Sequence, residues 1–324
     1  MYDVITVGAA IHDVFLLSDK FQLIAGKQFE GGMGECVPLG AKITVDKKVE
    51  STGGGATNAA VTFARLGFDA ACACKVGDDA SGREVIADLG REGVDTTLIR
   101  HVAGGETGYS VLLTAKNGER SVLTSRGVSA DWKPADLPWS SLHAKWFYVT
   151  SLAGNLAMAE RIGQAAGKGG SAVAWNPGHK ELDQSLAAVK PMLAHVSLLF
   201  LNREEAALLT GEQDPAAAFR AFADLPHLTV IITDGDKGAY AFRGAEAWGS
   251  GTTGASSVSR TGAGDAFGSG VTAAVMRGLP LEQALAVGTL NAEGVIKQIG
   301  AKKGILKAWP TAAQLKKVPV RSLA

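Results

Sequence analysis

The chain has 324 residues, of which 46% are hydrophobic and 20% are charged, which suits a protein with a sizeable buried core. Its 32 basic and 32 acidic residues cancel, so no charge excess favours nucleic acid or an anionic membrane as a partner. We therefore expect neither partner, and any bound anion must be held by a few local groups. The three cysteines and six histidines show no disulfide framework and no paired metal-ligand spacing.

The N-terminus enters a predicted strand at once, at residues 4–7. A secretory signal would show a basic segment and an apolar run here, and the sequence has neither, so we expect a cytoplasmic protein. No apolar run in the sequence approaches the ~20 residues that span a bilayer.

Two sections of the chain lack helical periodicity. Residues 18–51 are rich in Gly and Lys, with strands predicted near residues 43–49, and are interpreted as an appendage or flap. Residues 107–125 contain Asn117-Gly118, a pair that favours a hairpin turn because both turn residues need positive φ. Short strands are predicted on either side of that turn.

The rest of the chain alternates predicted strands with predicted helices. Further strands, most of them wholly apolar, are predicted at residues 70–76, 146–149, 172–175, 197–201, 230–233 and 239–242. Helices are predicted at residues 57–66, 82–92, 158–166, 203–209, 216–223, 266–276 and 281–299. Such alternation implies an α/β fold with a mainly parallel sheet between helices, in which ligands bind beyond the carboxyl ends of the strands.

Residues 53–58 read GGGATN and open a predicted helix. Glycines let the backbone approach a ligand closely, and the start of a helix offers free N–H groups. Asn58 carries a donor and acceptors that suit a ligand rich in hydroxyl groups. A glycine-rich turn without a ligand also explains this segment.

Two strand ends carry polar residues where ligands bind in such folds. Asn202 and Glu205 follow the strand at 197–201, where the amide can face a phosphate and the carboxylate can hold a metal-bound water. Helix capping by Asn202 is a compatible alternative. Thr233 and Gly235 lie at the end of the next strand, where an Asp-Gly turn is the simpler interpretation.

Residues 261–268 read TGAGDAFG and open a long apolar helix. Small residues at a helix N-terminus expose several N–H groups that bind an anion together with the helix dipole. Asp265 beside them can deprotonate a hydroxyl that attacks a phosphoryl group held there. We expect this carboxyl to be ionised at neutral pH because the helix N-terminus favours the anion. A glycine-rich helix entry with a dipole-favoured acid is the alternative.

Two common nucleotide-binding motifs are absent from the sequence. No segment matches G-x-x-x-x-G-K-[ST], which excludes a P-loop NTPase. Phe267 stands where G-x-G-x-x-G requires its third glycine, which argues against a dinucleotide-dependent dehydrogenase.

In this order and spacing the four motifs resemble those of the ribokinase-like (PfkB) family of sugar and nucleoside kinases, from Asp13 to about Gly304. The resemblance implies a three-layer α/β/α fold with a mostly parallel central sheet and a small β-sheet lid. It divides the chain into a core of residues 1–13, 51–103 and 128–324 and a lid of residues 14–50 and 104–127. A homodimer through the lid, as in relatives, is the implied protein partner.

The resemblance also implies an activity: transfer of the γ-phosphoryl group of ATP, with Mg²⁺, to a hydroxyl of a small sugar-like substrate. Asp265 matches the catalytic base, and the backbone N–H groups of Gly262, Ala263 and Gly264 match an anion hole. Glu205 matches a residue that organises Mg²⁺ through water. The other matches are Asp13, Gly54, Gly55 and Asn58 for the acceptor and Asn176, Asn202, Thr233, Gly235 and Asn291 for the nucleotide.

The match departs from the family at Ser259, where potassium-activated members carry an aspartate that binds the cation. Activation by a monovalent cation is therefore in doubt, and the following Arg260 can add positive charge near the nucleotide phosphates.

Residues 126–130 read RGVSA and resemble a pattern of fructokinase-like and 2-keto-3-deoxygluconate kinase-like members. Arg126 can meet a substrate carboxylate or ring oxygen, or it can be a hinge residue in a solvated turn. A ribokinase, a nucleoside kinase and a non-catalytic sugar- or nucleotide-binding protein of the same fold remain as alternatives.

Overall fold

The computed structural model describes residues 1–29, 32–115 and 120–323. The strands of its nine-stranded main sheet are β1 (Tyr2–Val7), β6 (Ala70–Ala73), β11 (Ala144–Val149), β12 (Ala172–Trp175), β13 (Leu198–Asn202), β14 (Thr229–Thr233), β15 (Ala239–Arg243), β16 (Glu246–Ser250) and β17 (Val320–Ser322). Their order is β17-β16-β15-β14-β13-β12-β11-β1-β6. From β14 to β6 neighbours pair in parallel, and the other edge is antiparallel, so the sheet is mostly parallel, as predicted.

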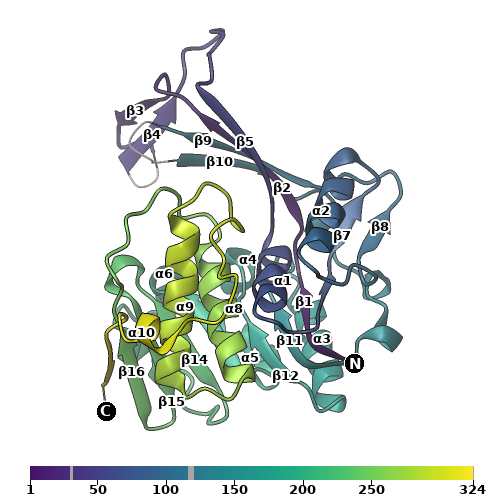
Figure 1. Ribbon diagram of the computed structural model, residues 1–324, viewed down its shortest axis with the longest axis vertical. Helices are drawn as coiled ribbons and strands as arrows, with labels where there is room; N and C mark the ends of the chain where they lie inside the picture. Colours follow the sequence, from purple (N-terminus) through teal and green to yellow (C-terminus); the bar gives the residue numbers. More distant parts are fainter. Residues whose placement is uncertain (30–31, 116–119, 324) are drawn as a thin grey trace.

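Helices cover both faces of this sheet (Figure 1). The helices of one face are α3 (Leu156–Lys168), α4 (His179–Leu182), α5 (Leu186–Leu193), α6 (Arg203–Thr210) and α7 (Pro215–Arg220). Those of the other are α1 (Gly55–Arg65), α8 (Ala263–Met276), α9 (Leu281–Ile296) and α10 (Ala312–Leu315), and α2 (Ala80–Arg91) packs against α1. The predicted three-layer arrangement is confirmed. Within the described residues, no helix has the length and apolarity needed to cross a membrane.

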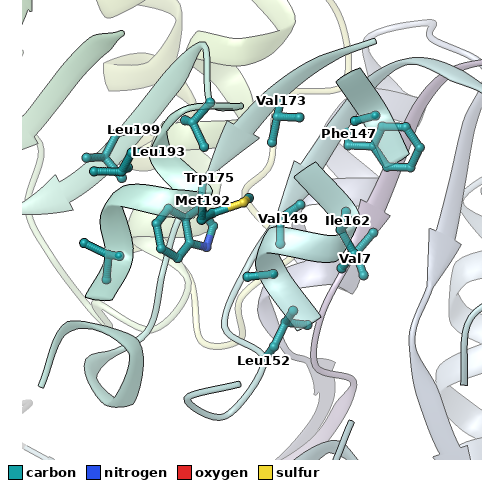
Figure 2. Close-up of a cluster of buried hydrophobic side chains, with 14 of the residues drawn as sticks. Val7, Phe147, Val149, Leu152, Ile162, Val173, Trp175, Met192, Leu193 and Leu199 are labelled. Atoms are coloured by element: carbon teal, nitrogen blue, oxygen red, sulfur yellow. The ribbon is translucent and has the colours of Figure 1, made fainter. Parts of the chain in front are cut away.

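Apolar side chains from adjacent parallel strands fill the core beneath α3 and α5. Figure 2 shows Trp175 of β12 with Val149 of β11, Leu199 of β13 and Met192 of α5. All four are at most 1% exposed. Full burial of one such aliphatic side chain contributes roughly 1.5–3 kcal/mol, so the wholly apolar runs that predicted these strands also hold them in the sheet.

A smaller sheet stands at one end of the main body (Figure 1). Its strands are β2 (Ile11–Leu17), β5 (Lys47–Gly53), β9 (Gly108–Thr114) and β10 (Arg120–Ser125), in the order β10-β9-β2-β5. Two more pairs of short strands are β3 (Gln22–Ala25) with β4 (Met33–Cys36) and β7 (Lys75–Gly77) with β8 (Arg100–Val102). Strands β2 and β5 run across the predicted borders between core and lid, at residues 13–14 and 50–51, and that division stays a prediction.

Several predicted elements differ from the structure. Residues 43–45 form no strand, because their β-branched side chains find no neighbouring strand and the Thr44 carbonyl instead accepts a hydrogen bond from Ser18 Oγ at 2.9 Å. The strand predicted at 70–76 is divided at Cys74 into β6 and β7, which belong to different sheets. The Asn117-Gly118 turn lies outside the described residues. The sequence did not predict β2, β3, β4, β8, β16, β17, α4, α5 and α10.

One buried carboxylate ties α4 to the loop after β11. Glu181 is 0% exposed and accepts hydrogen bonds from Ser151 Oγ at 3.0 Å and from three backbone N–H groups. These belong to Leu152 at 2.6 Å, Gly154 at 2.9 Å and Gly178 at 3.0 Å. The carboxylate thus replaces the water that these donors lose on folding.

Replacing this carboxylate should destabilise the protein strongly. Glu181→Ala leaves several buried donors without an acceptor, so we expect the free energy of unfolding to fall by about 3 kcal/mol or more. Urea unfolding followed by circular dichroism measures the change. Glu84→Ala, which removes an exposed partner of Arg91, is the control and should change stability little. Equal effects of the two substitutions would contradict the assigned role.

Candidate active site

The polar residues predicted at strand ends meet at one edge of the main sheet. Asn202 ends β13 in register with Thr233, which ends β14. Asn176 follows β12, and its Nδ2 lies 3.4 Å from the position that a Cβ on Gly268 of α8 would take. The carboxyl edge of the sheet therefore faces the first turns of α8.

The start of α8 requires residues without side chains. Gly262 has φ 80°, and a Cβ there would lie 2.5 Å from the Cβ of Ala301. Gly262 is the N-cap of α8, and Ala263 and Gly264 are its first residues, at a helix start of the kind that attracts anions. The Ala263 N–H also donates to the Arg260 carbonyl at 3.2 Å. A larger residue at 262 would move this turn.

Asp265, in the first turn of α8, contacts the start of α1. Asn58 Nδ2 donates a hydrogen bond to Asp265 Oδ2 at 2.8 Å, across 207 residues of sequence. Removal from water raises the pKa of the half-buried Asp265, and the Asn58 hydrogen bond lowers it. Burial therefore opposes the helix dipole, on which the expectation of an ionised carboxyl rests.

Asp13, in β2, lies directly over Gly53 of β5. A Cβ at Gly53 would lie 2.1 Å from Asp13 Oδ2, so only glycine fits beneath this carboxyl. Burial raises the pKa of Asp13 to about 6, against the lowering effects of a hydrogen bond from Ser110 and the charge of Lys302. The negative charge of Asp265 adds to the rise, so the two carboxyls influence each other electrostatically.

Asn202 and Glu205 form a reciprocal helix cap at the start of α6. Glu205 N–H donates to Asn202 Oδ1 at 2.8 Å, and Asn202 N–H donates to Glu205 Oε2 at 2.7 Å. Burial raises the pKa of Glu205, and the negative charges of Glu204 and Asp265 add to the rise. A nearby cation would stabilise the charged form of this carboxyl, so the residue is compatible with Mg²⁺ binding as well as with helix capping.

A cavity of about 460 Å³ lies beside the start of α8. Thr233 and Gly235 line one wall of it, and Ala263 and Gly264 line another, so the structure brings these predicted residues together. Arg260 also lines the cavity and is its one basic lining residue among those described.

Asn291 does not reach this cavity. It is 0% exposed, donates to the Ala266 carbonyl at 2.7 Å, and accepts from Leu306 N–H at 2.9 Å. Thr289 and Glu293 of the same helix line the cavity instead. Because successive helical residues are about 100° apart, Asn291 points away from the face that these two present. Asn291 therefore braces α9 against α8, and the structure does not bring it together with Thr233 and Gly235.

A second cavity, of about 550 Å³, lies beneath the smaller sheet. Phe15 and Leu17 of β2 line it from above, with Val258 and Ile299 of the main body below. Since side chains alternate along a strand, Asp13 projects from the same face of β2 as Phe15. The cavity thus lies on the same face of β2 as the Asp13 carboxyl.

The remaining predicted acceptor residues lie at the base of the smaller sheet. Gly54 caps α1 with φ 96°, and a Cβ there would lie 2.4 Å from the Ala9 carbonyl oxygen. A Cβ at Gly55 would lie 2.9 Å from Thr150. Arg126 is half-buried in the turn after β10, and within the described ranges no hydrogen bond or ion pair joins it to the carboxyl cluster.

Residues 4–308 match the model of the pfkB family carbohydrate kinases. The chain belongs to this family. It is a carbohydrate kinase, and more broadly a sugar or nucleoside kinase of the ribokinase family.

Individual relatives cover most of the chain. An ATP-dependent ribose-1-phosphate kinase of Halopiger xanaduensis is 31% identical over 238 residues, which cover 73% of this chain and 77% of the relative. An uncharacterized sugar kinase of Archaeoglobus fulgidus is 26% identical over 249 residues, which cover 75% of this chain and 97% of the relative. The structure of Arabidopsis thaliana ribokinase complexed with ribose and ATP superposes with a TM-score of 0.76 at 21% identity, over 98% of each chain. This likeness confirms the ribokinase fold.

The contact between Asn58 and Asp265 predicts a measurable pKa change. Asn58→Leu removes a donor to the charged carboxyl, so the pKa of Asp265 should rise further. A ¹³C NMR titration of protein labelled at the aspartate carboxyl carbons measures it. Asp95, held by Thr97 far from the site, is the internal control and should titrate unchanged. An unchanged pKa of Asp265 would show that the hydrogen bond does not stabilise its charge.

Proposed function

We propose that this kinase transfers the γ-phosphoryl group of ATP to a hydroxyl of a sugar or sugar-like acceptor, with Asp265 as general base. The observation that carries the proposal is the 2.8 Å contact between Asn58 and Asp265. It joins the glycine-rich segment suited to hydroxyl groups with the helix start suited to phosphate, so the reacting groups of both substrates can meet at one carboxylate.

The proposed transfer uses groups of this chain at each step. The acceptor O–H bond breaks, its proton passes to the Asp265 carboxylate, and the acceptor oxygen forms a bond to the γ-phosphorus. The bond from the γ-phosphorus to the bridging oxygen breaks, and ADP leaves. Backbone N–H groups at Gly262, Ala263 and Gly264 hold the developing negative charge, while Asn58 orients the base.

The cavity beside α8 is proposed to hold the nucleotide. Thr233 and Gly235 would flank it, Asn176 and Asn202 would face its phosphates, and Arg260 would add positive charge there. Mg²⁺, when bound, neutralises charge on the phosphate oxygens, and Glu205 is the residue proposed to hold it through water.

The acceptor is proposed to lie beneath the smaller sheet. Asp13, ionised at neutral pH, and Asn58 would accept hydrogen bonds from its hydroxyls, and Gly54 and Gly55 would allow close approach. Arg126 would contact a carboxylate or ring oxygen of the acceptor. A nucleoside is the second candidate acceptor, because the 550 Å³ cavity lies on the same face of β2 as Asp13 and a nucleoside kinase of Methanocaldococcus jannaschii has a TM-score of 0.76.

The smaller sheet also carries a proposed contact between two copies of the chain. Tyr109 is 41% exposed and Leu123 is 59% exposed, and their positions in β9 and β10 place both on the face away from Asp13. A second copy of the chain that packs on this exposed apolar face would bury it, and this supports a homodimer through the lid.

Asp265→Asn should abolish most of the turnover while binding persists. The amide keeps the shape but cannot take a proton, so kcat should fall by roughly 10²–10⁴-fold. The assay measures ATP consumption with ribose, fructose, 2-keto-3-deoxygluconate, sugar phosphates and nucleosides, and the best acceptor is used for the variant. Asp224→Asn, an exposed change, is the control. Near-normal turnover by Asp265→Asn would refute the role of this base.

The pKa of Asp13 predicts the pH dependence of acceptor use. As the pH falls through about 6, Asp13 gains a proton and accepts hydrogen bonds less well, so kcat/KM for the acceptor should decline. Asp13→Asn should raise KM and remove this component of the profile. A pH–rate profile from pH 5 to 9 measures it, and an unchanged acid limb in the variant would contradict the assignment.

A further inference from the structure

The loop at residues 300–305 touches both halves of the site. Ala301 packs beneath Gly262 at the start of α8, where a Cβ on the glycine would lie 2.5 Å from the Ala301 Cβ. A Cβ at Gly300 would lie 3.0 Å from Ser51 Oγ of β5. One short loop therefore separates the phosphate-binding turn from a strand of the smaller sheet.

Lys302 makes polar contacts with β5 from this loop. It is 5% exposed, and its Nζ donates to Thr52 Oγ1 at 2.6 Å and to Asp88 Oδ2 of α2 at 3.2 Å. The Thr52 hydroxyl also bonds to Asp88, so the three side chains form a closed network. Thr52 directly precedes Gly53, the residue beneath Asp13.

The backbone of the loop is held from the other side by α1. Arg65 Nη1 donates to the carbonyls of Lys302 and Ile305, each at 3.0 Å. The same guanidinium pairs with Glu92, its Nε to Oε2 at 2.7 Å and its Nη2 to Oε1 at 2.6 Å. The loop is thus hydrogen-bonded on two sides, to α1 through its backbone and to β5 and α2 through the Lys302 side chain.

We infer that Lys302 is a positioning residue that couples the phosphate-binding turn of α8 to strand β5 of the smaller sheet. The inference rests on the proposed function, because it takes the start of α8 as the place where the nucleotide phosphates bind. Phosphate at Gly262 presses on Ala301, and Lys302 passes the change to Thr52, which carries Gly53 and so the floor under Asp13. Nucleotide binding thereby orders the acceptor side of the site before the acceptor arrives.

A second route between the two halves must be separated from this one. The Asn58–Asp265 hydrogen bond links α8 directly to α1 and does not pass through β5. The experiment therefore follows β5 (Lys47–Gly53), to which Lys302 is hydrogen-bonded, and treats the start of α8 as the report of nucleotide binding itself.

Thr52→Val tests the coupling with the smallest change. The valine keeps the shape and leaves the Lys302–Asp88 ion pair intact, but it removes the hydroxyl that joins the pair to β5. The probe is Mg-ATP without acceptor, followed by amide hydrogen exchange of the whole chain. In the wild type, Mg-ATP should slow exchange both at residues 262–266 and in β5. In Thr52→Val, the slowing at 262–266 should remain, and the slowing in β5 should shrink at least fivefold.

Two further variants guard against a merely structural effect. Lys302→Met combined with Asp88→Leu removes both charges together, which a fold tolerates better than one unpaired charge, and should lose the β5 response as well. Lys75, as buried as Lys302, pairs with Asp136 at 2.6 Å outside the network. Lys75→Met breaks that pair and should keep the β5 response to Mg-ATP.

The outcomes separate the inference from the proposed function. If Mg-ATP slows exchange at 262–266 and β5 responds equally in the wild type and Thr52→Val, the coupling role is wrong while nucleotide binding stands. Absence of a β5 response in the wild type overturns it too. If Mg-ATP leaves residues 262–266 unchanged in the wild type, the proposed function fails, and the inference with it. The inference is supported if Thr52→Val and the Lys302→Met, Asp88→Leu double variant lose the β5 response but keep the response at 262–266.

Discussion

The site depends on the hydrogen bond between Asn58 and Asp265. It holds together the starts of α1 and α8, two helices that lie on the same face of the main sheet but far apart in the chain. Each helix start is preceded by a glycine with positive φ, Gly54 and Gly262, where the backbone packs too closely for a side chain. Glycine at these two positions therefore lets the start of α1 pack against Ala9 and the start of α8 pack against Ala301.

Several carboxyl groups lie near this junction, and their proximity lowers the stability of the folded protein. Burial raises the pKa of Asp13, Asp265 and Glu205, and Asp265 acts on both of the others through its charge. Such a cluster destabilises the ligand-free protein, because each charge is partly removed from water near others of the same sign. A cation or hydroxyl donor bound at these groups would relieve this destabilisation, and ligand binding would then raise the local stability.

Much of the fold could be predicted from the sequence because its signals are local. The apolar strands of the main sheet and the glycine-rich entry to α8 are both visible in short windows. Asn291 shows the limit, since the sequence does not indicate which face of α9 points to the cavity beside α8. Lys302 shows another, because its partners Thr52 and Asp88 are 250 and 214 residues away in the sequence. From the sequence alone, a buried lysine of this kind cannot be distinguished from a surface lysine, because its partners come together only in the fold.

The position of β1 has a consequence for how the chain acquires its structure. This first strand lies inside the main sheet, with β6 on one side and β11 on the other. Val7 is in register with Ala73 and with Val149, so one edge of β1 stays unpaired until the chain has been made well past its first hundred residues. During synthesis this apolar edge must avoid wrong strand pairing until β11 has been made. The order in which the strands are synthesised therefore affects folding.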